Sequence, residues 1–153
     1  MDRNEKKREL KRKNAIAILC KRWGKEGINT SFCDFLDIVR KERLLREIIN
    51  KLDEMDTDNK SLVYEKNKDI VSLYIHRLVE IIRDEESYVF FINVLADNEA
   101  FIIQGKNLKM KIDFLIRESG YPSKTCSILC CSQAMDKGWC LWSGEYDSRI
   151  YLW

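Results

Sequence analysis

The sequence predicts an α+β fold, with N-terminal helices packed on one face of an antiparallel sheet of four or five strands. Helix-type spacing of apolar residues dominates positions 1–84, whereas β-branched and aromatic runs gather after position 87. The expected element order, αααββαβββ, separates most helices from most strands, which is typical of α+β folds rather than wound parallel sheets. With 153 residues, 45% of them hydrophobic, the chain is expected to form one domain.

Three helices are expected in the first half of the chain. Residues 2–23 contain no glycine or proline and are rich in Lys, Arg, Glu and Ala, which favour helices. A second helix is predicted over 31–55, with Ser31 as its N-cap and a break near 40–43, where the apolar stripe is thin. The spacing of apolar residues predicts a third helix over 67–84. Residues 55–61 are expected to form the loop between the last two helices.

The second half is expected to supply the sheet. Residues 88–94 and 100–103 are predicted to pair as a hairpin around a turn at 96–99. A fourth helix is predicted to begin at Asn107 and to end at Ser119-Gly120, before Pro122. Three further strands are expected, separated in part by a turn over 144–148, and they cover residues 126–132, 139–143 and 149–153.

Charge is distributed unevenly along the chain. Residues 1–25 carry ten Lys and Arg against three Asp and Glu, a net charge of +7, and the remaining residues carry −5. A positive segment of this kind can bind phosphates, so a nucleic-acid-binding or regulatory module is one hypothesis for the protein. The segment lacks aromatic residues for stacking bases, so it is also interpreted as a solvated helix that complements an acidic surface. Its densest part consists of Lys6, Lys7, Arg8, Lys11, Arg12 and Lys13.

The sequence indicates a cytoplasmic protein. No apolar run approaches the ~18 residues that a membrane span needs. The apolar run at residues 15–20 is too short for a signal-peptide core and is not followed by a small-residue cleavage site. Cysteines of a cytoplasmic protein are expected to be reduced thiols.

Residues for catalysis or metal binding are not evident, so we expect no enzyme activity, no cofactor and no metal. The chain lacks a phosphate-binding loop and the usual hydrolase and metalloprotease motifs. Its one histidine, His76, is expected on the polar side of a helix beside Glu80. The cysteine spacing approaches that of a zinc site but lacks a second knuckle, which favours core thiols at Cys126, Cys130, Cys131 and Cys140. A small enzyme or a toxin is a second alternative function, beside the nucleic-acid-binding or regulatory module.

The C-terminal segment is the most distinctive part of the sequence. Three tryptophans and two tyrosines fall within residues 136–153. Such residues are enriched at the centres of protein interfaces. Because neighbouring strand residues face opposite sides, either Trp139 or Trp142 is expected to face outward or to lie under a helix.

The segments GYPSKTCSILCC and MDKGWCLWSGEYDSRIYLW, residues 120–131 and 135–153, resemble the C-terminal end of small bacterial immunity proteins. These proteins protect cells from toxin domains of contact-dependent growth inhibition and related polymorphic toxin systems. The shared pattern is a Gly-Tyr-Pro turn, a strand, a turn with a tryptophan, and a final strand pair joined by charged residues. Several family members carry histidines in that final turn, where this chain has Glu145 and Asp147.

The resemblance implies an inhibitor that binds a toxin domain, often a nuclease with a basic surface, without catalysis. Acidic and aromatic residues would then form the binding surface, because complementary charge speeds association and sets specificity. The partner-binding candidates are Asp53, Glu54, Asp56, Asp58, Asp84, Glu85, Glu86, Trp142, Glu145, Tyr146 and Asp147.

Overall fold

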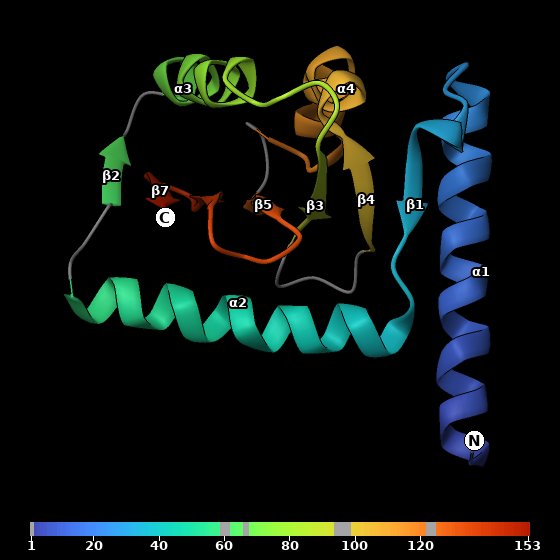
Figure 1. Cartoon of the computed structure of the whole chain (residues 1–153). Coiled ribbons are helices and arrows are strands. Elements are labelled where there is room, and N and C mark those ends of the chain that lie inside the picture. Colours follow the sequence, from blue (N-terminus) through green and yellow to red (C-terminus); the bar gives the residue numbers. More distant parts are fainter. Residues whose placement is uncertain (1, 59–61, 66–67, 94–98, 122–124) are drawn as a thin grey trace.

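A computed structural model describes residues 2–58, 62–65, 68–93, 99–121 and 125–153 (Figure 1). The first half of this part contains α1 (Arg3–Lys25), the 3₁₀ turn η1 (Thr30–Phe32), β1 (Cys33–Phe35), α2 (Ile38–Asp58), β2 (Leu62–Glu65) and α3 (Lys68–Glu80). The second half contains β3 (Ser87–Ile92), β4 (Ala100–Gln104), α4 (Gly105–Glu118), β5 (Cys126–Ser132), β6 (Gly138–Ser143) and β7 (Ser148–Leu152).

The described strands form one sheet in the order β1-β4-β3-β5-β6-β7-β2, and every neighbouring pair is antiparallel. The α+β class is therefore confirmed. The sheet has seven strands rather than the expected four or five, because β1 and β2 add to its two edges.

Helices cover both faces of the sheet, which corrects the expectation that they pack on one. Helices α3 and α4 lie over one face, α2 runs across the other, and α1 stands at the edge beside β1 (Figure 1). Strand alternation explains this arrangement, since the central strands are apolar on both faces. In β3, Phe90 belongs to the cluster under α3 and α4, while Val89 and Phe91 belong to the cluster against α2.

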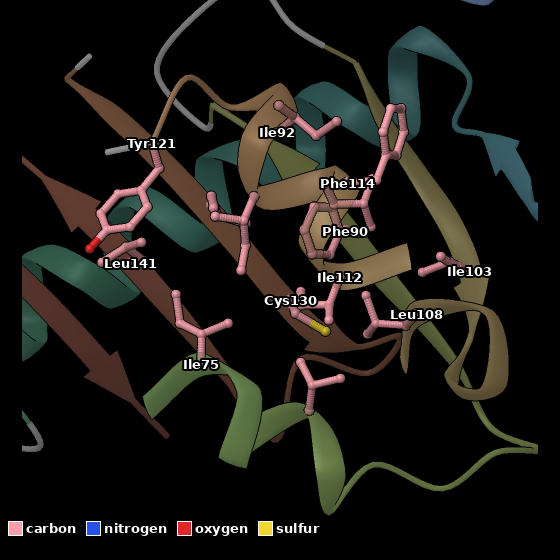
Figure 2. Packing of buried hydrophobic residues seen from close by; sticks show 14 of the residues in the cluster. Ile75, Phe90, Ile92, Ile103, Leu108, Ile112, Phe114, Tyr121, Cys130 and Leu141 are labelled. Atoms are coloured by element: carbon pink, nitrogen blue, oxygen red, sulfur yellow. The ribbon is translucent and has the colours of Figure 1, made fainter. Parts of the chain in front are cut away.

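The larger of these clusters lies between the sheet and the helices α3 and α4. Figure 2 shows Ile75 of α3 and Ile112 of α4 converging on strand residues that include Phe90 and Leu141. On the opposite face, α2 presents Leu44, Ile48, Leu52 and Met55 to the sheet. The spacing of three or four residues places these side chains on one side of the helix.

Helix α1 is fastened at its C-terminal end and by charge pairs along its length. Trp23 is fully buried, stacks with Phe32 and Phe35, and makes T-shaped contacts with Phe101 and Phe114. Arg8 pairs with Glu42 of α2, Arg12 with Glu99, and Arg22 with Glu118 of α4.

The predicted helix over 31–55 is wrong at its start. The Asn29 side chain accepts a 2.9 Å hydrogen bond from the Ser31 amide, which stabilises the turn η1, and Cys33–Phe35 then pairs with β4. Helix α2 begins later, where Asp37 accepts a 2.8 Å hydrogen bond from the Arg40 amide. The break expected near 40–43 is also wrong, because α2 is continuous through Asp58.

The other predicted elements agree with the structure to within a few residues. Helix α1, the β3–β4 hairpin, β5, β6 and β7 lie where the sequence places them. Helix α3 ends at Glu80 rather than 84, and α4 begins at Gly105 rather than at Asn107. Residues 59–61 of the predicted loop, 96–98 of the predicted turn, and Pro122 lie outside the described residues.

Candidate functional site

A cavity of about 330 Å³ opens between the C-terminal half of α2 and the β6–β7 hairpin. Helix α2 supplies two carboxylates to it, Asp53 and Asp56, and the hairpin supplies Asp147. Trp142, Arg149 and Tyr151 form the strand side of the cavity. Residues from three separate predicted groups therefore meet at one place.

Local structure explains why these residues face the cavity. Leu52 of α2 is buried against the sheet. Asp53 and Asp56 lie within about one helical turn of Leu52, so both reach the same rim of the cavity. Trp142 and Arg149 are directly paired across β6 and β7. Both strands place alternate residues on the α2 side, and this puts Tyr151 there as well.

The turn that carries Asp147 is held by two interactions. The Gly144 amide donates to the carbonyl oxygen of Asp147 at 2.9 Å. Behind it, the buried hydroxyls of Ser143 and Ser148 lie 3.1 Å apart and share a hydrogen bond. The hairpin therefore presents Asp147 from a constrained turn.

Asp56 has a hydrogen-bond partner and an ion-pair partner inside the cavity, whereas Asp53 and Asp147 have no described ion pair. The Tyr151 hydroxyl donates to Asp56 Oδ1 at 3.0 Å, and Arg149 lies 3.9 Å from the same oxygen. Burial raises the pKa of Tyr151 to about 12, so its hydroxyl stays protonated as a donor at neutral pH. No ion pair joins Asp53 or Asp147 to another described residue, so their charges are available to a partner.

The rim adds further acidic and aromatic groups. Tyr146 is 82% exposed at the tip of the hairpin, and Glu145 beside it is also exposed. Trp142 is half-buried. Glu54 is exposed on α2 but does not line the cavity, because it lies on another side of the helix from Asp53 and Asp56. Asp58 is the last residue of α2, and its side chain lies outside the described part of the structure. We call the set of Asp53, Asp56, Trp142, Glu145, Tyr146 and Asp147 the acidic aromatic patch.

The second predicted acidic cluster does not join this patch. The second cluster, Asp84, Glu85 and Glu86, lies in the α3–β3 loop. This loop leads into the start of β3, which pairs with the C-terminal end of β5. The β6–β7 turn lies at the opposite end of these strands. Asp84 is also 2.7 Å from Lys109 Nζ. Glu86 accepts from the Tyr88 hydroxyl at 3.0 Å and lies 3.4 Å from Arg83.

Two cavity residues, Arg149 and Tyr151, are absent from the predicted set. Both alternate with Ile150 along β7 and therefore lie on the opposite side of the sheet from it. Because α2 covers that side, Tyr151 is buried, and its hydroxyl reaches Asp56. The sequence signal that could have identified them is the spacing of Arg149 and Tyr151, two positions apart in the last predicted strand, beside the predicted strand that carries Trp142.

The cysteines of β5 and β6 lie on both faces of the sheet. Cys126 and Cys130 belong to the cluster under α3 and α4, and Cys131 and Cys140 belong to the cluster against α2. The four sulfur atoms therefore do not converge on one point. Burial raises the pKa of the Cys131 thiol to about 12 and those of Cys130 and Cys140 well above the usual value. These thiols act as small buried apolar groups.

His76 links two helices instead of facing a cavity with a nucleophile. Its Nδ1 lies 2.7 Å from the Ser72 carbonyl oxygen, and its Nε2 lies 2.6 Å from Asp113 Oδ1 on α4. Both oxygens can only accept, so both contacts are hydrogen bonds only when the ring is protonated. The Ser72 carbonyl, followed by Asp113, raises the pKa of His76 against an opposing effect of burial.

Replacing His76 with glutamine is expected to reduce stability more in acid than in base. Because the folded pKa is raised, the stabilisation is fully present below the unfolded value of about 6.5 and is lost as pH rises through the folded value. The contact is partly exposed, so we expect a loss below about 1 kcal/mol. Urea unfolding of both proteins at about pH 5.5 and about pH 8.5 measures this, and an equal loss at both values would contradict it.

The basic N-terminal helix uses part of its charge within the molecule. Arg8, Arg12 and Arg22 pair with Glu42, Glu99 and Glu118 respectively, so part of the acidic surface that this helix complements belongs to the same molecule. Four lysines of the dense segment are exposed, and they are Lys6, Lys7, Lys11 and Lys13.

Comparison with known proteins found no protein family, curated protein or solved structure that matches the chain. Within the described residues, none of the helices is long and apolar enough to cross a membrane.

Proposed function

We propose that this protein is an immunity-type inhibitor that binds a basic surface of a bacterial toxin domain through the acidic aromatic patch. The observation that supports this most directly is the convergence of Asp53, Asp56 and Asp147 with Trp142 around one cavity. Aromatic side chains offer rigid contact area, and uncompensated carboxylates attract a cationic surface.

The electrostatics of the cavity favour a cationic partner group. Three carboxylates and one guanidinium line it, and that guanidinium, of Arg149, already lies beside Asp56. The excess negative charge of Asp53 and Asp147 flanks an apolar floor formed by Ile49 and Leu52. A lysine or arginine side chain fits this combination, because its methylene stem can contact the floor while its head meets the carboxylates.

We propose a non-catalytic function because the histidine and the cysteines that could take part in catalysis are hydrogen-bonded or buried. His76 is bound on both nitrogens in its protonated form, and the thiols of β5 and β6 are buried. The resemblance of the β5–β7 segment to immunity proteins supports a toxin domain as the partner. A nuclease is the expected toxin class because its nucleic-acid-binding surface is basic.

Reversing charge at Asp53 and Asp147 together, as Asp53→Arg and Asp147→Arg, is expected to weaken toxin binding at least ~100-fold. Both residues are at the surface of the cavity and neither carries a described ion pair, so the fold should persist. The partner to be tested is the toxin domain encoded beside the gene for this chain. Its affinity is measured by calorimetry, and protection is measured by growth during co-expression.

A matched control comes from the other acidic cluster. Glu85→Arg changes an exposed charge at the opposite end of the sheet and should leave affinity within about twofold of the parent. Failure of the unmodified chain to protect cells would overturn the immunity function. Protection that survives the double reversal would instead overturn the location of the binding surface.

A further inference from the structure

The solvent-facing side of α1 carries a row of cations. Spacings of three or four residues place a set of exposed residues in one stripe that runs the length of the helix. A rise of about 1.5 Å per residue makes this stripe about 33 Å long. The stripe consists of Arg3, Lys7, Lys11, Asn14, Ile18, Lys21 and Lys25, and we call its five cations the basic row.

The acidic residues of the helix do not compensate the basic row. Asp2 and Glu5 bind each other's backbone in a capping box, with amide-to-carboxylate distances of 2.8 and 2.9 Å. Glu9 lies 3.4 Å from Arg12 and is half-buried. Residues 2–25 contain no other Asp or Glu, so the stripe has no carboxylate of its own.

The other elements also leave the basic row uncompensated. The ion pairs of α1 with α2, α4 and Glu99 are made by Arg8, Arg12 and Arg22, none of which belongs to the row. No ion pair joins a member of the row to another residue of the described chain. The acidic aromatic patch is remote, because α1 stands beside β1 at one edge of the sheet and the patch lies near the other edge (Figure 1).

The basic row destabilises the helix that carries it. Lys7 lies four residues from both Arg3 and Lys11, a spacing at which like charges repel each other. Lys21 and Lys25 repeat this spacing at the other end of the helix. On an ordinary solvated helix face, Glu and Lys alternate at such spacings and attract each other. The repulsion along α1 would be relieved by a polyanion that binds the row from outside.

Single-stranded nucleic acid and a lipid surface fit the stripe poorly. Single strands are usually held by aromatic side chains that stack on the bases, and the stripe contains none. A helix that lies in a membrane interface directs a wide apolar face toward the lipid. In α1 the apolar residues Leu19 and Trp23 pack against the protein core instead. The exposed large apolar side chains of the helix are Leu10 and Ile18, which stand eight residues apart among charged groups.

Duplex DNA fits the shape of α1 better. Its phosphates form a rigid and continuous row of negative charge, as the straight helix forms a row of positive charge. Residues 2–8 are all exposed, and this end of α1 extends past α2 (Figure 1). The projecting end can therefore approach the major groove of B-form DNA, which is about 12 Å wide and admits an α-helix. The major groove of an RNA duplex is too narrow for side chains to enter.

We propose that the basic row of α1 is a binding surface for the phosphate backbone of duplex DNA. The row consists mostly of lysines, which meet phosphates as point charges, and phosphate contacts carry no sequence information. The binding is therefore independent of base sequence and depends strongly on salt. This surface is independent of the toxin-binding proposal, which uses the acidic aromatic patch at the other edge of the sheet.

Fluorescence anisotropy of a labelled duplex of about 20 base pairs, titrated with the full-length chain, tests the proposal. We expect a dissociation constant in the micromolar range or below at about 50 mM salt. With about five phosphate contacts, the affinity should fall a few hundred-fold between about 50 and 200 mM salt. Two duplexes of unrelated sequence should bind within about threefold of each other. An absence of binding at the lowest salt, or an affinity that salt does not change, would overturn the proposal.

The triple change Lys7→Gln, Lys11→Gln and Lys21→Gln is expected to weaken duplex binding at least about tenfold at about 50 mM salt. It should also lower the exponent of the salt dependence by about 3, because each phosphate contact contributes about 0.9. These exposed lysines have no described ion pair and glutamine favours helices, so circular dichroism should show an unchanged fold. An unchanged affinity would contradict the assignment to α1.

A matched control removes the same charge outside α1. Arg77→Gln, Lys106→Gln and Lys137→Gln change three exposed cations on other elements and should alter the affinity less than about threefold. An equal loss of binding in the two triple variants would show that net charge, and not the basic row, controls binding.

Other polyanions test the choice of duplex DNA. A single strand of the same length and an RNA duplex are both expected to bind more weakly than the DNA duplex. Vesicles of phosphatidylcholine with about 30% phosphatidylserine are also expected to bind more weakly. Tighter binding of any of the three would overturn duplex DNA as the occupant. The α1 triple variant keeps the acidic aromatic patch and should protect cells from the toxin like the parent, so failure here and failure of the toxin-binding proposal are distinguishable.

Discussion

Replacing Trp23 with alanine is expected to lower the free energy of unfolding by about 3–5 kcal/mol and to release α1 from the sheet edge. Trp23 is the one fully buried side chain of α1 in the described structure, and it contacts aromatic rings from η1, β1, β4 and α4. Its removal leaves a large cavity where these four elements meet. Of the remaining attachments of α1, the Arg8–Glu42 ion pair is exposed and contributes little in water. The Glu118 side chain in the Arg22 pair is 11% exposed, and the Arg12–Glu99 pair is buried.

Circular dichroism during urea unfolding measures the loss without relying on tryptophan fluorescence. Hydrogen exchange should show that the α1 amides lose protection before those of β3 and β5. Ile18→Ala, at a 68% exposed position of the same helix, serves as the matched control and should cost less than about 0.5 kcal/mol. A Trp23→Ala protein with unchanged α1 protection would show that charge pairs, not the aromatic cluster, fasten the helix.

Replacing Glu99 with alanine is expected to cost about 3 kcal/mol, the second-largest effect. Its carboxylate is 6% exposed and lies between Arg12 Nε at 3.3 Å and Lys41 Nζ at 3.5 Å. The Arg12 contact is an ion pair without hydrogen-bond alignment, since neither Arg12 Nε nor Glu99 Oε2 has a hydrogen-bond partner. Without Glu99, the poorly solvated Lys41 of α2 would face Arg12 of α1, which would keep only its 3.4 Å contact with Glu9.

An exposed pair between the same two helices provides the control. Glu42→Ala removes the partner of Arg8, at side chains that are 44% and 55% exposed, and should cost about 0–1 kcal/mol. The triple change Arg12→Met, Lys41→Met and Glu99→Met should restore much of the stability, because no buried charge is left unpaired. If the triple variant is less stable than Glu99→Ala, burial of unpaired charge is not the cause.

Local patterns in the sequence were sufficient for α1, α3, α4 and the central strands, but not for the start and continuity of α2. Helix α1 has strong helix formers throughout, and β3, β4 and β5 combine β-branched and aromatic residues with clear turns. The two edge strands could not be found in this way. β1 has three residues and β2 has four, and β1 pairs with β4 far along the chain. Such short strands depend on a sheet edge that exists only after the rest has folded.

The placement of helices on both faces of the sheet also could not be predicted from local sequence patterns. Ile150 and Tyr151 face opposite sides of the sheet, and both are buried. A two-sided sheet buries both sets of residues, so alternation of polarity is weaker and its meaning depends on the covering helix. That covering helix is α2, which also supplies half of the candidate site.

The sequence by itself determined the α+β class and the helices α1, α3 and α4, and it suggested acidic and aromatic residues as candidates for a binding surface. Only the tertiary structure decided which of them act together. It joined Asp53 and Asp56 to Trp142 and Asp147 because α2 crosses beneath the β6–β7 hairpin, and it placed Asp84, Glu85 and Glu86 at the opposite end of the strands. Residue composition is a property of the local chain, whereas a cavity depends on contacts between segments that are about 90 residues apart in the sequence.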